Sequence, residues 1–220
     1  MQELPLSATP VTLLILAATV IVSWRTMDDY RAKSKLLMNP YQVVHGKDYA
    51  RILTHGLIHG SWIHLIFNMI VFYSFGQLVE LVFTSGWMGE QMFGKVGHLV
   101  YLLLYVGAIA FATLPSLIKH RDNPGYNSLG ASGAVFAVLT VAVLINPTGN
   151  VLFFFAIPCP GWLALIIMFG MEYYLQKRGG TGIAHDAHLW GAGFGILFVA
   201  IFKMEILLGF FKQIQGALSF

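Results

Sequence analysis

Residues 131–145 read ASGAVFAVLTVAVLI, a stretch without a single charged side chain. The rest of the 220-residue chain has the same character, since 57% of it is hydrophobic and only 10% is charged. Its mean hydropathy is +0.70. Soluble domains carry about 25% charged residues, well above the 10% of this chain. We therefore interpret the chain as an integral membrane protein, which excludes a soluble domain and a disordered chain.

Charge and cysteine content exclude two further classes. The net charge is +3, but the Lys and Arg residues form no stripe along the chain, so a nucleic-acid binder is not expected. The one cysteine, Cys159, cannot form an intramolecular disulfide. The first residues, MQELPLSATP, lack the basic start of a signal peptide, and we expect residues 1–220 to form a single integral membrane domain.

Apolar runs flank this stretch on both sides. A bilayer core about 30 Å thick requires about 20 apolar residues per helix. Helices satisfy their own backbone groups in lipid, so we predict an all-α membrane protein with a bundle of six transmembrane helices. The runs cover about residues 4–24, 62–83, 96–117, 131–145, 151–174 and 188–211.

Two connections between the runs differ from simple turns. Residues 25–61 hold many of the charges, and a connection of this length is expected to be functional or partly structured. Residues 177–182 read KRGGTG, which is typical either of a movable cap or of a plain linker.

Polar residues within the apolar runs are the candidate functional groups, because they are costly in lipid. His64 and Asn68 are four residues apart and share one helix face. Ser132 opens the fourth run and His188 opens the sixth. In six helices of alternating direction, the second, fourth and sixth begin at the same side, so we expect these groups to meet.

The fourth run is too short to span the whole hydrocarbon layer. About fourteen residues cover only about 21 Å, so Ser132 is expected below the membrane surface. His188 stands at a similar distance before Lys203. Two recessed polar helix starts predict a water-filled pocket that opens to one membrane face.

These residue types suit acyl transfer. A serine hydroxyl becomes a nucleophile when a nearby base takes its proton, and a neutral imidazole does so near pH 7. Ser132 and His188 are the candidate pair. Backbone N–H groups at a helix start, with side-chain donors from Asn68 and His64, would stabilise the oxyanion. Gly130 and Gly133 would let the backbone pass close to the pocket.

Three separated motifs resemble those of the rhomboid family of intramembrane serine proteases, and the resemblance covers about residues 51–196. Residues 55–68 read HGLIHGSWIHLIFN, like the second-helix segment of that family. Residues 130–133, GASG, resemble its GxSG nucleophile motif, and residues 187–191, AHLWG, with Gly195 resemble its His-x-x-Gly-x-x-x-Gly helix.

The resemblance implies a Ser132–His188 dyad without a third acid and without a cofactor, and it places His64 and Asn68 at the oxyanion. It implies substrates that are single-span membrane proteins, cut near the membrane surface. It also implies that the first connection lies partly in the membrane and that residues 177–187 cap the site.

Two departures from the family pattern concern the surroundings of the site. Phe136 stands where many members have a tyrosine that packs on the catalytic imidazole, so the stacking is expected to survive. Ala50 and Arg51 replace a Trp-Arg pair, which bears on the anchoring of the first connection.

Other interpretations remain open. Ser132 alone is typical of a helix-packing surface, and Gly191 with Gly195 predicts close packing of the sixth helix on the fourth. His55, His59 and His64 are possible metal ligands, but no HExxH motif and no nearby cysteine accompany them, so we expect no metal and a structural role for the first two histidines.

Alternatives also exist for the protein as a whole and for its acidic residues. Asp186 is a possible third member of the site, and Glu80 and Glu172 are expected to be solvated or paired. The alternative functions are an inactive rhomboid-like protein that binds transmembrane clients and a small transporter. The sequence does not specify the oligomeric state.

The orientation in the membrane is indicated by two conflicting signals. Most Lys and Arg residues lie in the connections on the side of the site, which the positive-inside rule places in the cytoplasm. Bacterial rhomboids have this side outside. We follow the family and expect a bacterial inner membrane with the site facing the non-cytoplasmic side.

Overall fold

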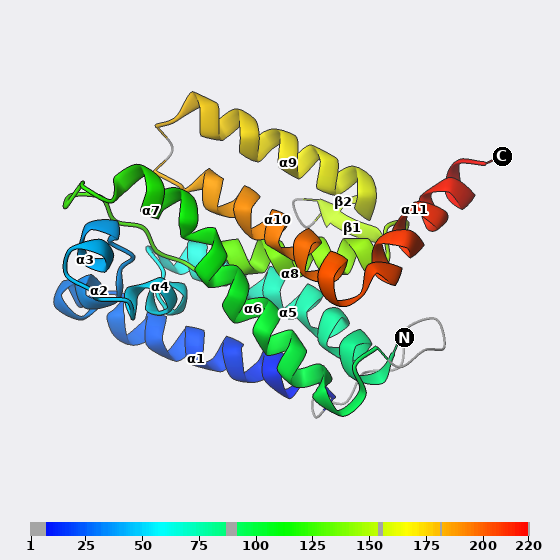
Figure 1. Cartoon of the computed structure of the whole chain (residues 1–220), viewed down its shortest axis with the longest axis horizontal. Coiled ribbons are helices and arrows are strands. Elements are labelled where there is room, and N and C mark those ends of the chain that lie inside the picture. Colours follow the sequence, from blue (N-terminus) through cyan, green and yellow to red (C-terminus); the bar gives the residue numbers. More distant parts are fainter. Residues whose placement is uncertain (1–7, 87–91, 154–155, 181, 220) are drawn as a thin grey trace.

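The computed structural model describes residues 8–86, 92–153, 156–180 and 182–219, and the described part is mostly helical (Figure 1). The elements, in chain order, are α1 (Pro10–Thr26), α2 (Tyr30–Leu36), α3 (Pro40–Val44), α4 (Arg51–Thr54), η2 (His55–Leu57), α5 (Trp62–Ser85), η3 (Gly94–Val96), α6 (Gly97–Ala112), α7 (Leu114–His120), α8 (Ser132–Ile145), β1 (Asn150–Phe153), β2 (Ile157–Pro160), α9 (Gly161–Arg178), α10 (His185–Phe202) and α11 (Met204–Leu218).

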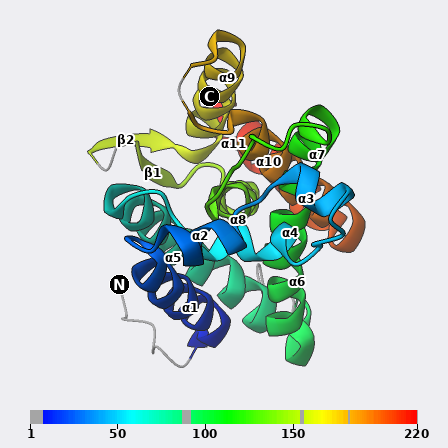
Figure 2. The same ribbon diagram turned by 90° about the vertical axis from the view of Figure 1, so that its left-hand side faces the viewer.

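Helix α8 forms the centre of the bundle, with α5, α6 and α10 around it (Figure 2). A helix that is apolar on all sides is expected to be buried on all sides. Every residue of α8 is buried except Ser132 and Phe136, which are partly exposed and lie one turn apart on the same face. The central helix therefore opens to its surroundings only where the candidate nucleophile lies.

Glycines bring α10 into direct contact with the backbone of α8, as the sequence predicts. A Cβ atom at Gly191 would overlap the carbonyl oxygen of Gly133, and one at Gly195 would lie 2.7 Å from the carbonyl oxygen of Ala137. A Cβ atom at Gly133 would in turn lie 2.5 Å from that of Ala112 on α6. The two helices that carry Ser132 and His188 are thus held at backbone contact.

Helix α1 is joined to α5 through a buried carboxylate. Glu80 is fully buried and accepts hydrogen bonds from the backbone N–H groups of Val11 and Thr12, at 2.9 and 2.8 Å, and from the Thr12 hydroxyl at 2.7 Å. His98 lies 2.7 Å away as a further partner. Glu80 is thus paired, one of the two environments that the sequence predicts.

The helices α5, α8 and α10 all begin at the same end of the bundle (Figure 1), as their alternating direction predicts. Three helical segments are long and apolar enough to cross a membrane: Trp62–Ser85, Gly94–His120 and His185–Phe202. Pro10–Thr26 and Ser132–Ile145 are shorter apolar helices. The chain is an all-α membrane protein, and the number of six spans stays a prediction.

The structure corrects two of the predicted boundaries. The fifth run, which we expected to be helical from about residue 151, begins instead with two antiparallel strands, residues 150–153 and 157–160, in which Val151 lies opposite Cys159. The sixth run ends as one helix at Phe202, and after Lys203 a separate helix, α11, follows. Residues 4–7 of the first run lie outside the described residues.

The long connection between α1 and α5 is structured, as its length predicts. It contains α2, α3, α4 and η2. The Arg51 side chain anchors it by donating hydrogen bonds to the Asp48 carboxylate at 2.7 Å and to the carbonyl oxygens of Ser34 and Leu37 at 2.8 and 2.9 Å. Arg51 therefore anchors this connection without the Trp-Arg pair.

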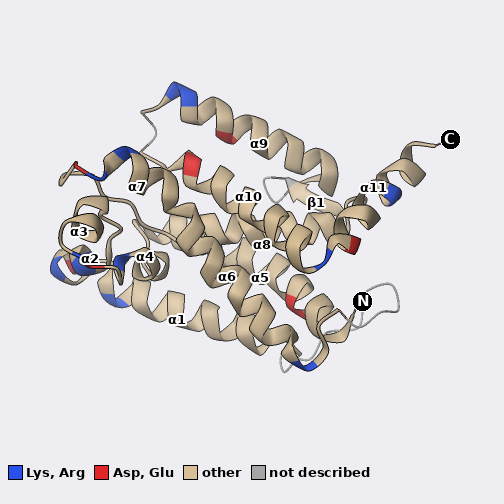
Figure 3. Cartoon of the chain, viewed as in Figure 1, with Lys and Arg blue, Asp and Glu red and all other residues tan. Residues whose placement is uncertain are grey.

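Positive charge gathers at one end of the molecule, around α2, α7 and the end of α9 (Figure 3). All but Lys95, Lys203 and Lys212 of the 13 Lys and Arg residues belong to the connections or helix ends on this side. Because α8 and α10 also begin there, the candidate site lies at the positive end.

Candidate active site

Ser132 and His188 meet at the start of α8 and α10. The Ser132 hydroxyl lies 2.8 Å from Nε2 of His188, a hydrogen-bond distance. Ser132 is the first residue of α8, and His188 lies in the first turn of α10. Two residues that are 56 positions apart are therefore brought together by the backbone contact between the two helices.

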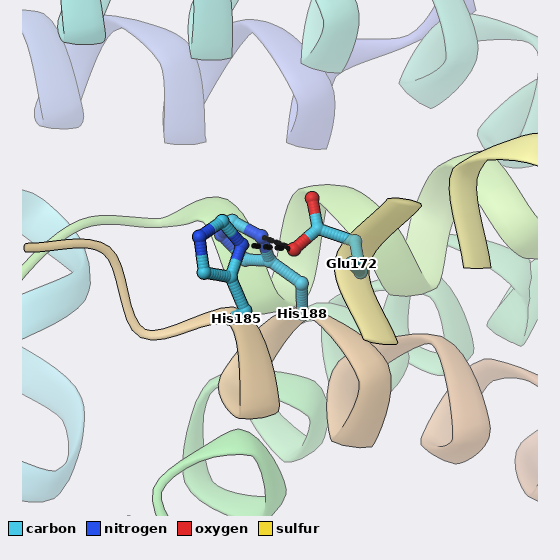
Figure 4. A group of neighbouring side chains, drawn as sticks. All are labelled: Glu172, His185 and His188. Atoms are coloured by element: carbon cyan, nitrogen blue, oxygen red, sulfur yellow. Dashed lines mark hydrogen bonds and ion pairs between the residues drawn. The ribbon is translucent and has the colours of Figure 1, made fainter. Parts of the chain in front are cut away.

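The opposite nitrogen of His188 contacts a carboxylate that the motifs do not contain. Glu172 on α9 lies with Oε2 at 2.9 Å from Nδ1 of His188 and at 2.6 Å from Nδ1 of His185 (Figure 4). Sequence reasoning predicted only a solvated or paired carboxylate here. The signal that would have revealed it is a single acidic residue within an apolar run.

Asp186, the acid that the sequence offered as a third member, is directed elsewhere. Its Oδ2 atom lies 2.7 Å from Nζ of Lys119 on α7, and its Oδ1 atom accepts a hydrogen bond from the Ala187 N–H at 3.0 Å. Glu172 is thus the carboxylate that contacts the His188 ring.

Phe136 covers one face of the His188 imidazole. The ring centroids are 4.4 Å apart and the planes differ by 5°, so the rings are stacked. Phe136 lies one turn after Ser132 on the exposed face of α8. The predicted stacking is confirmed, and it restricts rotation of the imidazole.

The candidate oxyanion groups, His64 and Asn68 on α5, line the same cavity as Ser132. His64 is close to Gly130, where an added Cβ atom would lie 3.0 and 3.2 Å from Cε1 and Nε2 of His64. Gly130 has φ +112°, which L side chains rarely adopt, so glycine is needed there on two grounds. Asn68 donates one hydrogen bond from Nδ2 to the His64 carbonyl at 3.1 Å, and its second N–H is available by valence.

His55 and His59, which precede the spanning helix α5, are buried. The His55 carbonyl accepts a hydrogen bond from the Gly130 N–H at 2.9 Å. Because the Ser23 hydroxyl donates to the Leu57 carbonyl at 2.9 Å, its oxygen accepts from Nδ1 of His59, also at 2.9 Å. The His59 contact fits the structural hydrogen bonding expected for both histidines, whereas the His55 contact comes from its backbone, so the role of the His55 imidazole stays a prediction.

Burial also fixes the protonation state of these two histidines. It lowers the pKa of His55 to about 4, and the interaction with the Ile52 backbone, which raises this pKa, is the smaller effect. It lowers the pKa of His59 to about 3, with a further contribution from the neighbouring His64. Both imidazoles are therefore neutral near pH 7.

A cavity of about 1560 Å³ joins these groups. Ser132, His188, His64 and Asn68 all line it, together with Glu172. Gly182, Ile183 and Ala184 of the connection between α9 and α10 also line it, while Thr181 in the predicted cap lies outside the described residues. A cavity is therefore present at the serine, and its water content and its opening to one membrane face stay predictions.

One group of side chains in the described part of the chain has the composition of a metal site. Glu172, His185 and His188 each offer one ligand atom, and these atoms lie within 4.8 Å of one another. The distances from Oε2 of Glu172 to Nδ1 of His185 and to Nδ1 of His188 are 2.6 and 2.9 Å, which are typical of hydrogen bonds between a carboxylate and an imidazole N–H. The geometry is therefore that of a hydrogen-bonded cluster.

Comparison with known proteins assigns the family. The Rhomboid domain matches residues 46–205, which is most of the chain. The chain belongs to the rhomboid family. This span includes all the candidate site residues: Gly130, Ser132, Gly133, Phe136, His64, Asn68, His188, Gly191 and Gly195.

Several rhomboid proteins are similar to this chain at low identity. "RHOMBOID-like protein 12, mitochondrial" of Arabidopsis thaliana is 28% identical over 183 residues, covering 82% of this chain and 54% of that protein. "Rhomboid protease GlpG" of Haemophilus influenzae is 23% identical over 189 residues, covering 85% and 88%. The human "Presenilin-associated rhomboid-like protein, mitochondrial" is 29% identical over 202 residues, covering 84% and 46%. The chain thus spans about half the length of two of these relatives.

Proposed function

We propose that this rhomboid-family protein is an intramembrane serine endopeptidase that cleaves transmembrane segments of other membrane proteins. Ser132 is the nucleophile and His188 is the base. The observation that carries the proposal is the hydrogen bond of 2.8 Å between the two side chains, at the wall of a cavity inside an all-α membrane protein. No cofactor is needed for this chemistry.

The first half of the reaction forms an acyl-enzyme. The Ser132 oxygen attacks the carbonyl carbon of the scissile peptide while its proton moves to Nε2 of His188. The tetrahedral intermediate collapses, the C–N bond breaks, and the leaving amine takes the proton from Nε2. The stacked ring of Phe136 keeps the imidazole in line with both positions.

The negative charge on the intermediate requires donors at the serine. The backbone N–H of Ser132 lies at the start of α8, where the helix dipole favours an anion. The second N–H of Asn68 and the ring of His64 are the side-chain donors that we propose for the oxyanion. Preorganised donors of this kind are worth about 100- to 1000-fold in rate each.

The second half of the reaction uses water. His188 takes a proton from a water molecule, whose oxygen attacks the acyl carbon. The ester bond to Ser132 breaks, and the proton returns from Nε2 to the serine oxygen. The cavity supplies room for this water beside the serine.

A transmembrane substrate suits the surroundings of the site. The cavity walls include apolar side chains such as Val71, Phe75 and Met168, which favour an apolar peptide segment.

One of the relatives described above is named a protease. We propose that residues 1–220 act as one domain in a bacterial inner membrane, with the site toward the non-cytoplasmic side, where a substrate chain can unwind.

Reconstitution into lipid vesicles with a fluorogenic transmembrane reporter tests the proposal. We expect Ser132→Ala and His188→Ala to fold but to lose cleavage by about 1000-fold or more. Matched controls outside the cavity are Ser85→Ala, whose hydroxyl donates to the Leu81 carbonyl on its own helix, and His45→Ala, which contacts Asp122 at the surface. Cleavage at the wild-type rate by either site variant would refute the assignment, and retention of the reporter without cleavage would indicate an inactive client-binding protein.

A further inference from the structure

Glu172 lies in a part of α9 that has little other contact with the bundle. The buried residues of α9 are Gly161, Ala164 and Leu165, all in its first two turns. Tyr173, next to Glu172, is 54% exposed. The Glu172 side chain is only 14% exposed, because it turns inward to the two histidines of α10 (Figure 4). Its inward position therefore follows from its polar contacts.

Within the described residues, the side chains at hydrogen-bond distance from the Glu172 carboxylate are these two imidazoles. Lys177 and Arg178 lie further along the same helix, and Lys177 is placed over the ring of Tyr173. A carboxylate in an apolar span is costly unless it is paired. Both Nδ1 atoms converge on the same oxygen, Oε2, so this oxygen is fixed from two directions.

This arrangement determines which nitrogen of His188 carries the proton. An ionised carboxylate only accepts hydrogen bonds, so Nδ1 of His188 must be the protonated nitrogen. Nε2 then presents its lone pair to the Ser132 hydroxyl, which is the tautomer that a general base requires. The same carboxylate lies beside the positive charge that the ring gains when the serine proton arrives.

We propose that Glu172 is a positioning residue for His188, so that the chain uses a Ser132–His188–Glu172 relay in which His185 holds the carboxylate in place. This inference rests on the proposed protease function. It differs from the dyad that the family resemblance implies. It also differs from the Asp186 alternative, because Asp186 contacts Lys119 and the backbone of Ala187.

The decisive variant is Glu172→Gln, which keeps the size of the side chain and removes the charge. An amide can donate to Nδ1 and thereby favour the wrong tautomer, so we expect kcat to fall by about 100- to 10,000-fold while KM changes by less than about threefold. Glu172→Asp retains the carboxylate, and its kcat is expected to be at least about tenfold higher than that of Glu172→Gln. Tyr173→Phe is the matched control on the exposed face of α9, with an expected rate equal to that of the wild type.

A measurement on the unaltered protein guards against a variant that fails to fold. With ¹⁵N-labelled histidine, the wild type is expected to show a low-field Nδ1–H resonance that disappears in His188→Ala. Its absence from the wild type would overturn the proposal. So would a kcat of Glu172→Gln within threefold of the wild type, or loss of wild-type activity on chelation that Zn²⁺ restores, because the cluster would then hold a metal.

The failure of this inference can be told apart from the failure of the protease proposal. If the wild type does not cleave the reporter, the protease function itself is wrong. If the wild type cleaves and Glu172→Gln cleaves equally well, only the role of Glu172 is wrong.

Discussion

Gly191→Ala tests whether the contact between α8 and α10 sets the geometry of the site. The added Cβ atom would overlap the carbonyl oxygen of Gly133, so the two backbones must separate before α10 can pack again. Overpacking of this kind costs about 1–3 kcal/mol of stability. Gly133 follows Ser132 directly and His188 lies one turn before Gly191, so the separation acts on the hydrogen bond of 2.8 Å.

The rate should respond more strongly than the stability. A displacement of about 1 Å at reacting groups costs on the order of 100-fold in rate. We therefore expect Gly191→Ala to lower the unfolding temperature in detergent and to reduce reporter cleavage by about 100-fold. Thermal unfolding and the initial cleavage rate, measured on the same preparation, give both quantities.

Gly193→Ala provides the control within the same helix. Nothing lies within 4 Å of a Cβ atom at Gly193, so the substitution meets no neighbour. Replacing a helical glycine with alanine is then expected to stabilise the protein by up to about 1 kcal/mol, with cleavage unchanged. Equal stability and equal activity of Gly191→Ala and Gly193→Ala would show that backbone contact with α8 does not set the geometry of the site.

Three further predictions concern the surroundings of the serine. Phe136→Leu removes the ring stacked on His188, a contact worth about 0.5–1.5 kcal/mol, and should slow cleavage by about 3- to 10-fold, whereas Phe136→Tyr should keep the wild-type rate. Asn68→Ala should lower kcat by about 100-fold or more in the same assay, and an unchanged kcat would remove Asn68 from the oxyanion site. Because the pKa values of His55 and His59 are lowered in the folded protein, the unfolded chain binds more protons than the folded one below pH 6.5. The free energy of unfolding is therefore highest above that pH and falls toward pH 4. Each of the two histidines lowers the free energy of unfolding by about 1.4 kcal/mol per pH unit in this range. Unfolding temperatures measured from pH 7 to pH 5 test this, and an unfolding temperature that does not change with pH would contradict it.

The central part of the fold follows from local sequence features. The apolar run 131–145 predicts the bounds of α8 within one residue, because the run contains no charged side chain that would keep part of the helix in water. The spacing of Gly191 and Gly195 predicts contact with α8, because the backbone can approach only where Cβ atoms are absent. The meeting of Ser132 and His188 follows from the shared direction of their helices.

Two features were not predicted, for different reasons. The paired strands at residues 150–153 and 157–160 are apolar, and hydropathy alone does not distinguish an apolar strand from an apolar helix. Pro158 and Pro160 were the local signal against a helix. Glu172 belongs to no motif, and only the packing of α9 near α10 brings it to His188. A sequence pattern describes residues on one element and does not reveal which other element will supply a ligand or a charge.

The proposed chemistry depends on activation of the Ser132 hydroxyl by His188. The most direct measurement is the rate of covalent labelling by a fluorophosphonate, with the modified residue identified by mass spectrometry of the digested protein. We expect one adduct, on Ser132, which is absent from Ser132→Ala and forms at least about 100-fold more slowly in His188→Ala. An adduct on another residue, or equally fast labelling of the His188→Ala protein, would contradict it.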